Sequence, residues 1–349
     1  MQFNKMNGST ISCDVLSSFM AEKRPITIDE ACALRLLLFG NTMNSFGVAW
    51  TEQSFHFRCV PPYGFIQKRA GPCGVLAAVQ AFVIYELLFG VSCIDAKLGI
   101  SKLKSREKKE ALARALTYIL WQAGDDERAV VAIKHNDIVF DASTATNILE
   151  FDGIIEYNIS TIIYLKIKQE MDDPGSHLIG GDGYCSQEVI NLILIGKAVP
   201  NLFDGDLELN SGGSETTLLR GIPKQSKIGL LSLYEYQETC TVGDNYKNPI
   251  YPIWILLAES HFTVLFAVSK DIFKKRKSKD TFVLYHYDGL AKQHAETIYA
   301  INPAANTSPP PKDKTLPIAI RCIYTRWPYA SVETNEKEVN EDQTEASGV

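Results

Sequence analysis

The sequence predicts an α+β fold in which helices from the first half of the chain pack on a mainly antiparallel sheet built by the second half. Two observations lead to this prediction. Capped apolar segments of helical length concentrate in the first two hundred residues, and short segments rich in β-branched and aromatic residues follow one another near the end. With 349 residues, 46% of them hydrophobic, and no internal repeat, the chain can form a single large core.

Four segments carry the start or stop signals of helices. In the first, Thr27 and Glu30 have the spacing of a capping box, and Gly40 stands where a helix commonly ends. In the second, Pro72 occupies the position that proline favours at a helix start. The predicted helices cover residues 27–40, 72–90, 105–122 and 186–196.

Five segments are predicted to be strands because they are rich in β-branched and aromatic residues. One lies in the first half of the chain, and four follow one another in the second half, where we expect an antiparallel sheet. These segments are residues 128–134, 252–258, 261–268, 281–289 and 316–325.

Both ends of the chain differ from the rest in composition. Residues 1–26 carry weak structural signals and are predicted to be an N-terminal extension. The last 17 residues contain six acidic residues, one lysine and no aromatic residue, so we predict an acidic disordered tail over residues 331–349. Residues 27–330 then form one domain.

Composition excludes several classes of protein. A net charge of −6 gives no indication of a nucleic-acid partner, and no apolar run reaches the roughly 18 residues that a membrane helix needs. The eight cysteines are scattered without a zinc-binding spacing, so we expect neither a metal nor another cofactor. Because no export signal is visible, we expect reduced thiols and a cytoplasmic protein. We also expect a monomer. The basic run at residues 273–280 adds a nuclear location as a second expectation, although such a run is more often a solvated loop.

Cys73 is the candidate nucleophile because it falls in the first turn of a predicted helix. Unpaired N–H groups and the positive end of the helix dipole stabilise a thiolate at that position. The preceding Ala70 and Gly71 are small enough for a substrate backbone to approach. By spacing alone, a catalytic cysteine and an ordinary capped core helix are equally compatible with this segment.

Three further residues could complete a thiol-hydrolase site. Gln67 lies six residues before Cys73, where papain-like peptidases carry a glutamine that donates to the oxyanion; a solvated loop residue is the alternative. Among six histidines, His261 begins a predicted strand after the polar pair Glu259–Ser260, so it is the candidate general base and acid. Asp288 ends the next predicted strand and could orient His261, although aspartate before glycine is also a common turn residue.

With these residues in hand, the chain resembles the MINDY deubiquitinases, in the branch of the third and fourth human paralogues. Matching blocks extend in order from about Glu30 to Trp327, and they include QKRAGPCGVLAAVQAF, GYCSQEVINLILIGKAVPN, PIWILLAESHFTVLF and YHYDGL. The family nucleophile falls on Cys73, its oxyanion glutamine on Gln67 and its histidine on His261. One departure is Ala70, where such families often have a glycine.

The resemblance implies a papain-like fold and a thiol-dependent ubiquitinyl hydrolase that cuts isopeptide bonds in polyubiquitin, with a preference for lysine-48-linked chains. Its partners would be polyubiquitin and ubiquitinated proteins. The tail of ubiquitin is basic and ends in two glycines, so a narrow channel with acids near its mouth is expected. A catalytically weak or inactive relative that binds ubiquitin as a scaffold is the alternative.

Overall fold

The structure is a computed structural model that describes residues 24–91, 100–126, 132–134, 154–156, 167–173, 175–210, 216–274, 280–291 and 293–335. The helices longer than one turn are α2 (Ile28–Phe39), α4 (Cys73–Phe89), α5 (Ser105–Ala123), α7 (Gln187–Ile195) and α10 (Ile318–Arg326). The short helices with described bounds are α3 (Val48–Thr51), η1 (Ile100–Lys102), α8 (Leu233–Tyr236), α9 (Asp244–Lys247) and η4 (Lys270–Phe273), and residues 167–170 are also helical. The strands are β1 (Arg24–Pro25), β2 (Ala132–Lys134), β3 (Ile154–Glu156), β4 (Asp206–Asn210), β5 (Thr216–Arg220), β6 (Gly229–Ser232), β7 (Ile253–Ala258), β8 (His261–Phe266), β9 (Phe282–Tyr287), β10 (Thr297–Asn302) and β11 (Ser331–Thr334).

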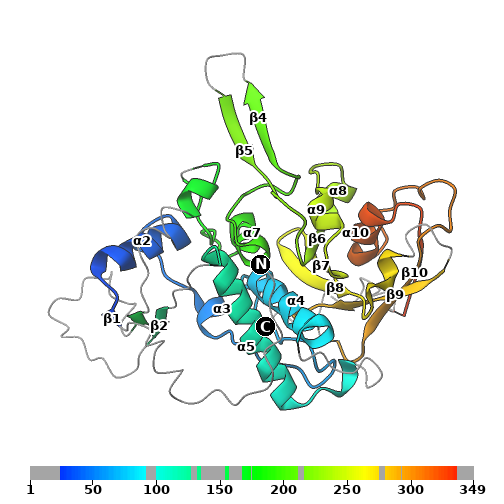
Figure 1. The fold of residues 1–349 in the computed structure, drawn as a ribbon, viewed down its shortest axis with the longest axis horizontal. Coiled ribbons are helices and arrows are strands. Elements are labelled where there is room, and N and C mark those ends of the chain that lie inside the picture. The colour runs from blue at the N-terminus through cyan, green and yellow to red at the C-terminus, as the bar shows by residue number, and fades with distance from the viewer. Residues whose placement is uncertain are drawn as a thin grey trace, which may run out of the picture.

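The main sheet has six strands in the order β11-β10-β9-β8-β7-β6. All neighbours pair antiparallel except β6 and β7, which are parallel. The α+β class is therefore confirmed, with a sheet that is mixed but mostly antiparallel. Two smaller sheets, β1-β3-β2 and the hairpin β4-β5, lie outside it, and the hairpin projects from the body of the molecule (Figure 1).

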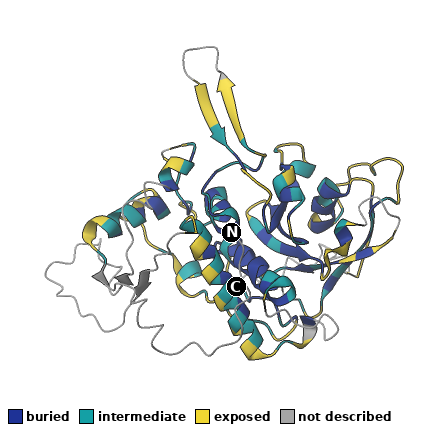
Figure 2. Cartoon of the chain, in the orientation of Figure 1, coloured by how far each residue is buried: buried dark blue, intermediate teal, exposed yellow. Residues whose placement is uncertain are grey.

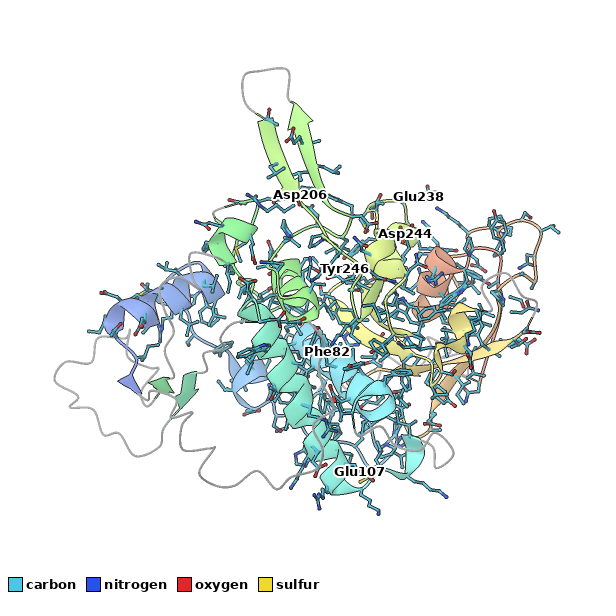
Figure 3. All side chains as sticks on the ribbon, viewed as in Figure 1. Phe82, Glu107, Asp206, Glu238, Asp244 and Tyr246 are labelled. Atoms are coloured by element: carbon cyan, nitrogen blue, oxygen red, sulfur yellow. The ribbon has the colours of Figure 1, made fainter. Side chains whose placement is uncertain are left out.

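Helix α4 is the centre of the molecule because its sequence is apolar almost all round. It contacts α5, α7 and strands β7 and β8, and most of its residues are buried (Figure 2). Phe82 in its middle is fully buried (Figure 3). Both faces of the sheet are covered: Ile255 of β7 joins the core around α4, whereas its neighbour Trp254 joins the core around α10 on the opposite face. A strand buried on both faces reads as a continuous apolar run, as β7 does.

The predicted helix signals are confirmed at α2 and α7. Thr27 and Glu30 form a capping box at the start of α2, and Gly40 ends it in the left-handed conformation with φ 73°. Gly196 ends α7 in the same way, but the Ser186 side chain makes no capping hydrogen bond. Helix α5 covers the predicted segment as well.

The predicted strand over residues 316–325 is wrong, because this segment forms helix α10. Ala319, Ile320, Ile323 and Arg326 are buried, and their spacing is that of one helical face. That face packs on the sheet beside Trp254 and α8. Tertiary packing thus outweighs the strand propensity of the β-branched residues.

The predicted tail begins too early, because Ser331–Thr334 form β11 and pair with β10. Asn335 continues the contact, since its side chain accepts a hydrogen bond from the Ile298 N–H at 2.7 Å. Residues 336–349, most of the predicted N-terminal extension and part of the predicted strand at 128–134 lie outside the described residues, as do residues 275–279 of the basic run. Within the described part of the chain, no helix has both the length and the apolarity to cross a bilayer.

Candidate active site

The thiol of Cys73 lies at the start of α4, where Pro72 is the N-cap and Cys73 the first helical residue. Proline was predicted to be the first helical residue, so the helix begins one position later. The first backbone bond of this turn runs from the Leu76 N–H to the Pro72 carbonyl, and the N–H groups before it have no helical partner. The Cys73 side chain is 2% exposed, and its Sγ donates to the Ser260 carbonyl at 3.2 Å.

His261 reaches the same place from a tight turn between two strands. Strands β7 and β8 pair as far as Ala258 and His261, so only Glu259 and Ser260 connect them. Glu259 has φ 55°, a left-handed value that residues other than glycine seldom adopt. The turn therefore brings the Ser260 carbonyl and the His261 ring together at the N-terminal end of α4, beside Cys73.

Asp288 follows β9, which pairs with β8, and this pairing brings its carboxylate beside His261. The His261 Nε2 lies 2.9 Å from Oδ1 of Asp288. The same oxygen accepts the Leu290 N–H at 2.8 Å, which fixes the carboxylate. Because Nε2 is engaged by Asp288, Nδ1 is the ring nitrogen that remains for the Cys73 thiol.

His261 and Asp288 each stabilise the charged form of the other. Burial disfavours the imidazolium, but hydrogen bonds and charge interactions with Asp288 and Cys73 outweigh it and raise the pKa of His261 to about 10. Burial likewise opposes the Asp288 carboxylate, yet the bond from His261 keeps the pKa of Asp288 below its ordinary value. At neutral pH the pair is an imidazolium and a carboxylate, and an imidazolium stabilises a neighbouring thiolate.

Gln67 is 6% exposed and is not a solvated loop residue. Its N–H donates to the Gly289 carbonyl at 2.9 Å, beside Asp288, and its side-chain Nε2 donates to the Arg69 carbonyl at 2.8 Å. The segment before it is held by the buried Gln80 of α4, whose side chain accepts the Phe65 N–H at 2.6 Å. Gln67 and Cys73 line the same small cavity.

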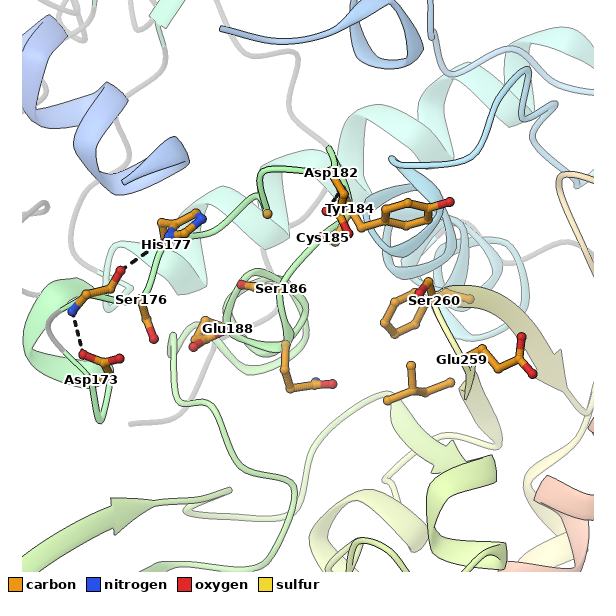
Figure 4. A pocket seen from close by; sticks show the side chains of 15 residues that line it. Asp173, Ser176, His177, Asp182, Tyr184, Cys185, Ser186, Glu188, Glu259 and Ser260 are labelled. Atoms are coloured by element: carbon orange, nitrogen blue, oxygen red, sulfur yellow. Dashed lines mark hydrogen bonds between the residues drawn. The ribbon is translucent and has the colours of Figure 1, made fainter. Parts of the chain in front are cut away.

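A larger cavity of about 590 Å³ opens beside the Ser260 turn (Figure 4). Its lining includes four carboxylates, and no lysine or arginine is among the residues that line it. The carboxylates are Asp173, Asp182, Glu188 and Glu259. The cavity therefore favours a positively charged ligand next to the thiol.

Cys185 is the site residue that the sequence did not indicate. It lines the acidic cavity, and its Sγ donates to the Gly71 carbonyl at 3.5 Å. No spacing rule relates residues 73 and 185, since only the packing of α7 on α4 brings them together.

Two other described histidines have different surroundings. His286 contacts the Thr263 hydroxyl at 2.9 Å, and His177 lines the far part of the acidic cavity (Figure 4). His135 lies outside the described residues. Among the residues that the structure describes, no group of three or more histidine, cysteine, aspartate or glutamate side chains could hold a metal ion.

Comparisons with known proteins point to one family. A family model described as "Deubiquitinating enzyme MINDY-3/4, conserved domain" matches residues 35–165 and 149–336. The chain is 37% identical to the probable ubiquitin carboxyl-terminal hydrolase MINDY-4 of Xenopus tropicalis, over 91% of this chain and 47% of that protein. It is 36% identical to the human protein of that name, over 89% and 46%.

More distantly, the chain is 28% identical to the human ubiquitin carboxyl-terminal hydrolase MINDY-3, over 62% of this chain and 60% of that protein. No solved structure matches. The chain spans about half the length of the MINDY-4 proteins that it matches.

Proposed function

The chain belongs to the MINDY-3/4 family of deubiquitinating enzymes, and from this membership we propose that it is a thiol-dependent deubiquitinase that hydrolyses isopeptide bonds in polyubiquitin. One observation carries the proposal beyond membership. Cys73 at a helix start lies beside His261, which contacts Asp288, and this arrangement supports the roles of nucleophile, base and orienting carboxylate that we propose for them.

In the proposed reaction the Cys73 thiolate attacks the carbonyl carbon of the isopeptide bond after ubiquitin's terminal glycine. The Cys73 N–H and the Gln67 side chain would stabilise the oxyanion. The Gln67 amide has two N–H bonds; one donates to Arg69, which leaves the other for the oxyanion. His261 then protonates the leaving lysine amine, and later takes a proton from the water that hydrolyses the thioester.

The arrangement of the elements supports a papain-like fold as the finer assignment. In such a fold a helix bears the nucleophile at its N-terminus and packs on an antiparallel sheet that carries the histidine and its partner. Here α4 packs on β7 and β8, His261 begins β8, and Asp288 follows β9. We propose this fold on the basis of that correspondence.

The acidic cavity supports ubiquitin as the ligand. The tail of ubiquitin is basic and ends in two glycines, so a channel that accepts it should combine acids with a close approach to the thiol. The carboxylates that line the acidic cavity meet the first requirement, and Gly71, with φ 120°, provides a backbone without a side chain beside Cys73. Ala70, the departure from the family pattern, is exposed.

We further propose that the protein prefers lysine-48-linked chains. We also propose that it is located in the cytoplasm, with the nucleus as a second location. The linkage preference rests on family resemblance, and cleavage of a panel of di- and tetra-ubiquitins of each linkage tests it. The location rests on the need of a nucleophilic thiol for a reducing compartment. Fractionation of cells that express the chain tests it.

The decisive experiment uses ubiquitin with a thiol-reactive electrophile at its C-terminus. We expect covalent capture by the protein and none by the Cys73→Ala variant, which should still bind ubiquitin. Saturable binding without capture would instead support the scaffold alternative, which the low exposure of the Cys73 thiol and its bond to Ser260 also favour. Absence of both binding and capture would overturn the proposed function.

A further inference from the structure

Two thiols meet at the first turn of α4. The Gly71 carbonyl oxygen lies 3.9 Å from Cys73 Sγ and 3.5 Å from Cys185 Sγ, so both sulfurs contact the same atom. A β-carbon built on Gly74 would lie 3.2 Å from the β-carbon of Cys185. Because residue 74 has no side chain, Cys185 packs directly against the helix backbone beside Cys73.

The two thiols differ in chemistry. Cys73 lies at the start of α4, and its side chain interacts with that of His261. Burial raises the pKa of Cys185 to about 12, with a further increase from the charge of Cys73, although N–H groups of Val75 and Gly74 oppose the effect. Cys185 therefore stays a neutral thiol. Since cysteines at helix starts beside a histidine are the more reactive toward peroxide, oxidation would begin at Cys73.

We propose that Cys73 and Cys185 form a reversible disulfide after hydrogen peroxide oxidises Cys73. Cys185 then serves as the resolving thiol of the site. In the first step the Cys73 thiolate attacks one oxygen of hydrogen peroxide. The O–O bond breaks, Cys73 becomes a sulfenic acid, and the hydroxide released takes a proton to become water.

In the second step the Cys185 sulfur attacks the Cys73 sulfur and forms the S–S bond. The sulfenic hydroxyl leaves with the Cys185 proton as a second water. The two thiols together lose two electrons, and one peroxide is reduced to two waters. A dithiol reductant returns the two electrons and restores both thiols by exchange.

This disulfide would protect the nucleophile from permanent loss. A sulfenic acid that finds no second thiol is oxidised further to sulfinic acid, which common reductants do not reverse. Cys185 lines the acidic cavity, which gives small molecules a route to the Cys185 side of the pair. The inference concerns the two thiols alone and does not require that ubiquitin is the substrate.

The test treats the full chain with hydrogen peroxide, blocks free thiols and maps the peptides by mass spectrometry. We expect a peptide pair linked through Cys73 and Cys185, with a mass lower by two hydrogens. After dithiothreitol, Cys73 should again react with iodoacetamide to nearly its original extent. In Cys185→Ser, Cys73 should instead accumulate as sulfinic acid, and recovery after dithiothreitol should be at least several-fold lower.

Cys240→Ser is the matched control, because Cys240 is also a partly buried free cysteine but contacts Ser232. This variant should recover like the unmodified protein. If Cys185→Ser does not fold, Cys185→Ala and the peptide map of the unmodified protein still decide the question. Direct conversion of Cys73 to sulfinic acid in the unmodified protein, or equal recovery without Cys185, would overturn the proposal.

Discussion

Replacing Asp288 by asparagine tests the electrostatics of the site most directly. The substitution keeps the shape of the side chain and a hydrogen-bonding group but removes the charge that faces His261 at 2.9 Å. Without this charge, the pKa of His261 should fall from about 10 toward the ordinary value of about 6.5. At pH 7.5 a histidine with that ordinary pKa is protonated to only about one tenth, so the imidazolium population should fall by up to roughly tenfold.

Two measurements follow the change. In Asp288→Asn, the rate of Cys73 alkylation by iodoacetamide should lose the part of its pH dependence, between pH 7 and 10, that depends on the His261 imidazolium. The same shift appears in stability: a pKa raised by folding stabilises the protein below the unfolded value of about 6.5, and this contribution is lost as pH rises through about 10. Asp288→Asn should therefore show a smaller loss of unfolding free energy across this window.

Glu259→Gln is the control, because it removes a carboxylate that lines the acidic cavity, whereas the groups that act on the pKa of His261 are Asp288 and Cys73. Its alkylation profile should match that of the unmodified protein. If Asp288→Asn and Glu259→Gln give the same profile as the unmodified protein, Asp288 does not govern His261 and the proposed group is wrong.

Three further predictions concern the histidine, the glutamine and the fold. His261→Ala should remove the imidazolium and make Cys73 alkylation rise only at the high pH of a free thiol, near 8.5; an unchanged profile would exclude this histidine. Gln67→Ala should lower kcat for chain cleavage by roughly 10²–10³ with little change in ubiquitin affinity, while alkylation of Cys73 persists; a parallel fall of both rates would show that Gln67 only holds the loop. Ile323→Ala should lower the free energy of unfolding by about 2–5 kcal/mol because Ile323 is fully buried on the face of α10 that packs on the sheet, whereas Ile318→Ala at an exposed position should cost less than about 1 kcal/mol, as urea denaturation would show.

Local signals in the sequence predicted the parts of the fold that depend on local chemistry. The caps of α2 are a case: Thr27, Glu30 and Gly40 satisfy backbone groups within a few residues of themselves. Residues 316–325 were misassigned because their β-branched composition resembles a strand. Only the neighbouring sheet decides which of their apolar side chains share a face.

The candidate site likewise contains residues that local sequence signals could indicate and residues whose position depends on tertiary packing. Cys73 could be singled out because its setting, a helix start after Pro72, is local. Asp288 could be suggested because adjacent antiparallel strands bring the start of one beside the end of the next. The burial of Gln67 and the position of Cys185 could not be predicted, since each depends on segments that meet only in the folded chain.

The site is divided between two distant parts of the chain, and this has a consequence for synthesis on the ribosome. Cys73 leaves the ribosome long before Ser260, its hydrogen-bond partner 187 residues later, and before Asp288, which follows β9. Until strands β7 to β9 have been made and paired, the nascent thiol has neither an imidazolium nor a fixed carboxylate beside it, and it behaves as an ordinary cysteine. If Cys73 is the nucleophile, as proposed, emerging chains and fragments that end before β9 lack the groups that would activate it, because those groups belong to the half of the domain that is made last.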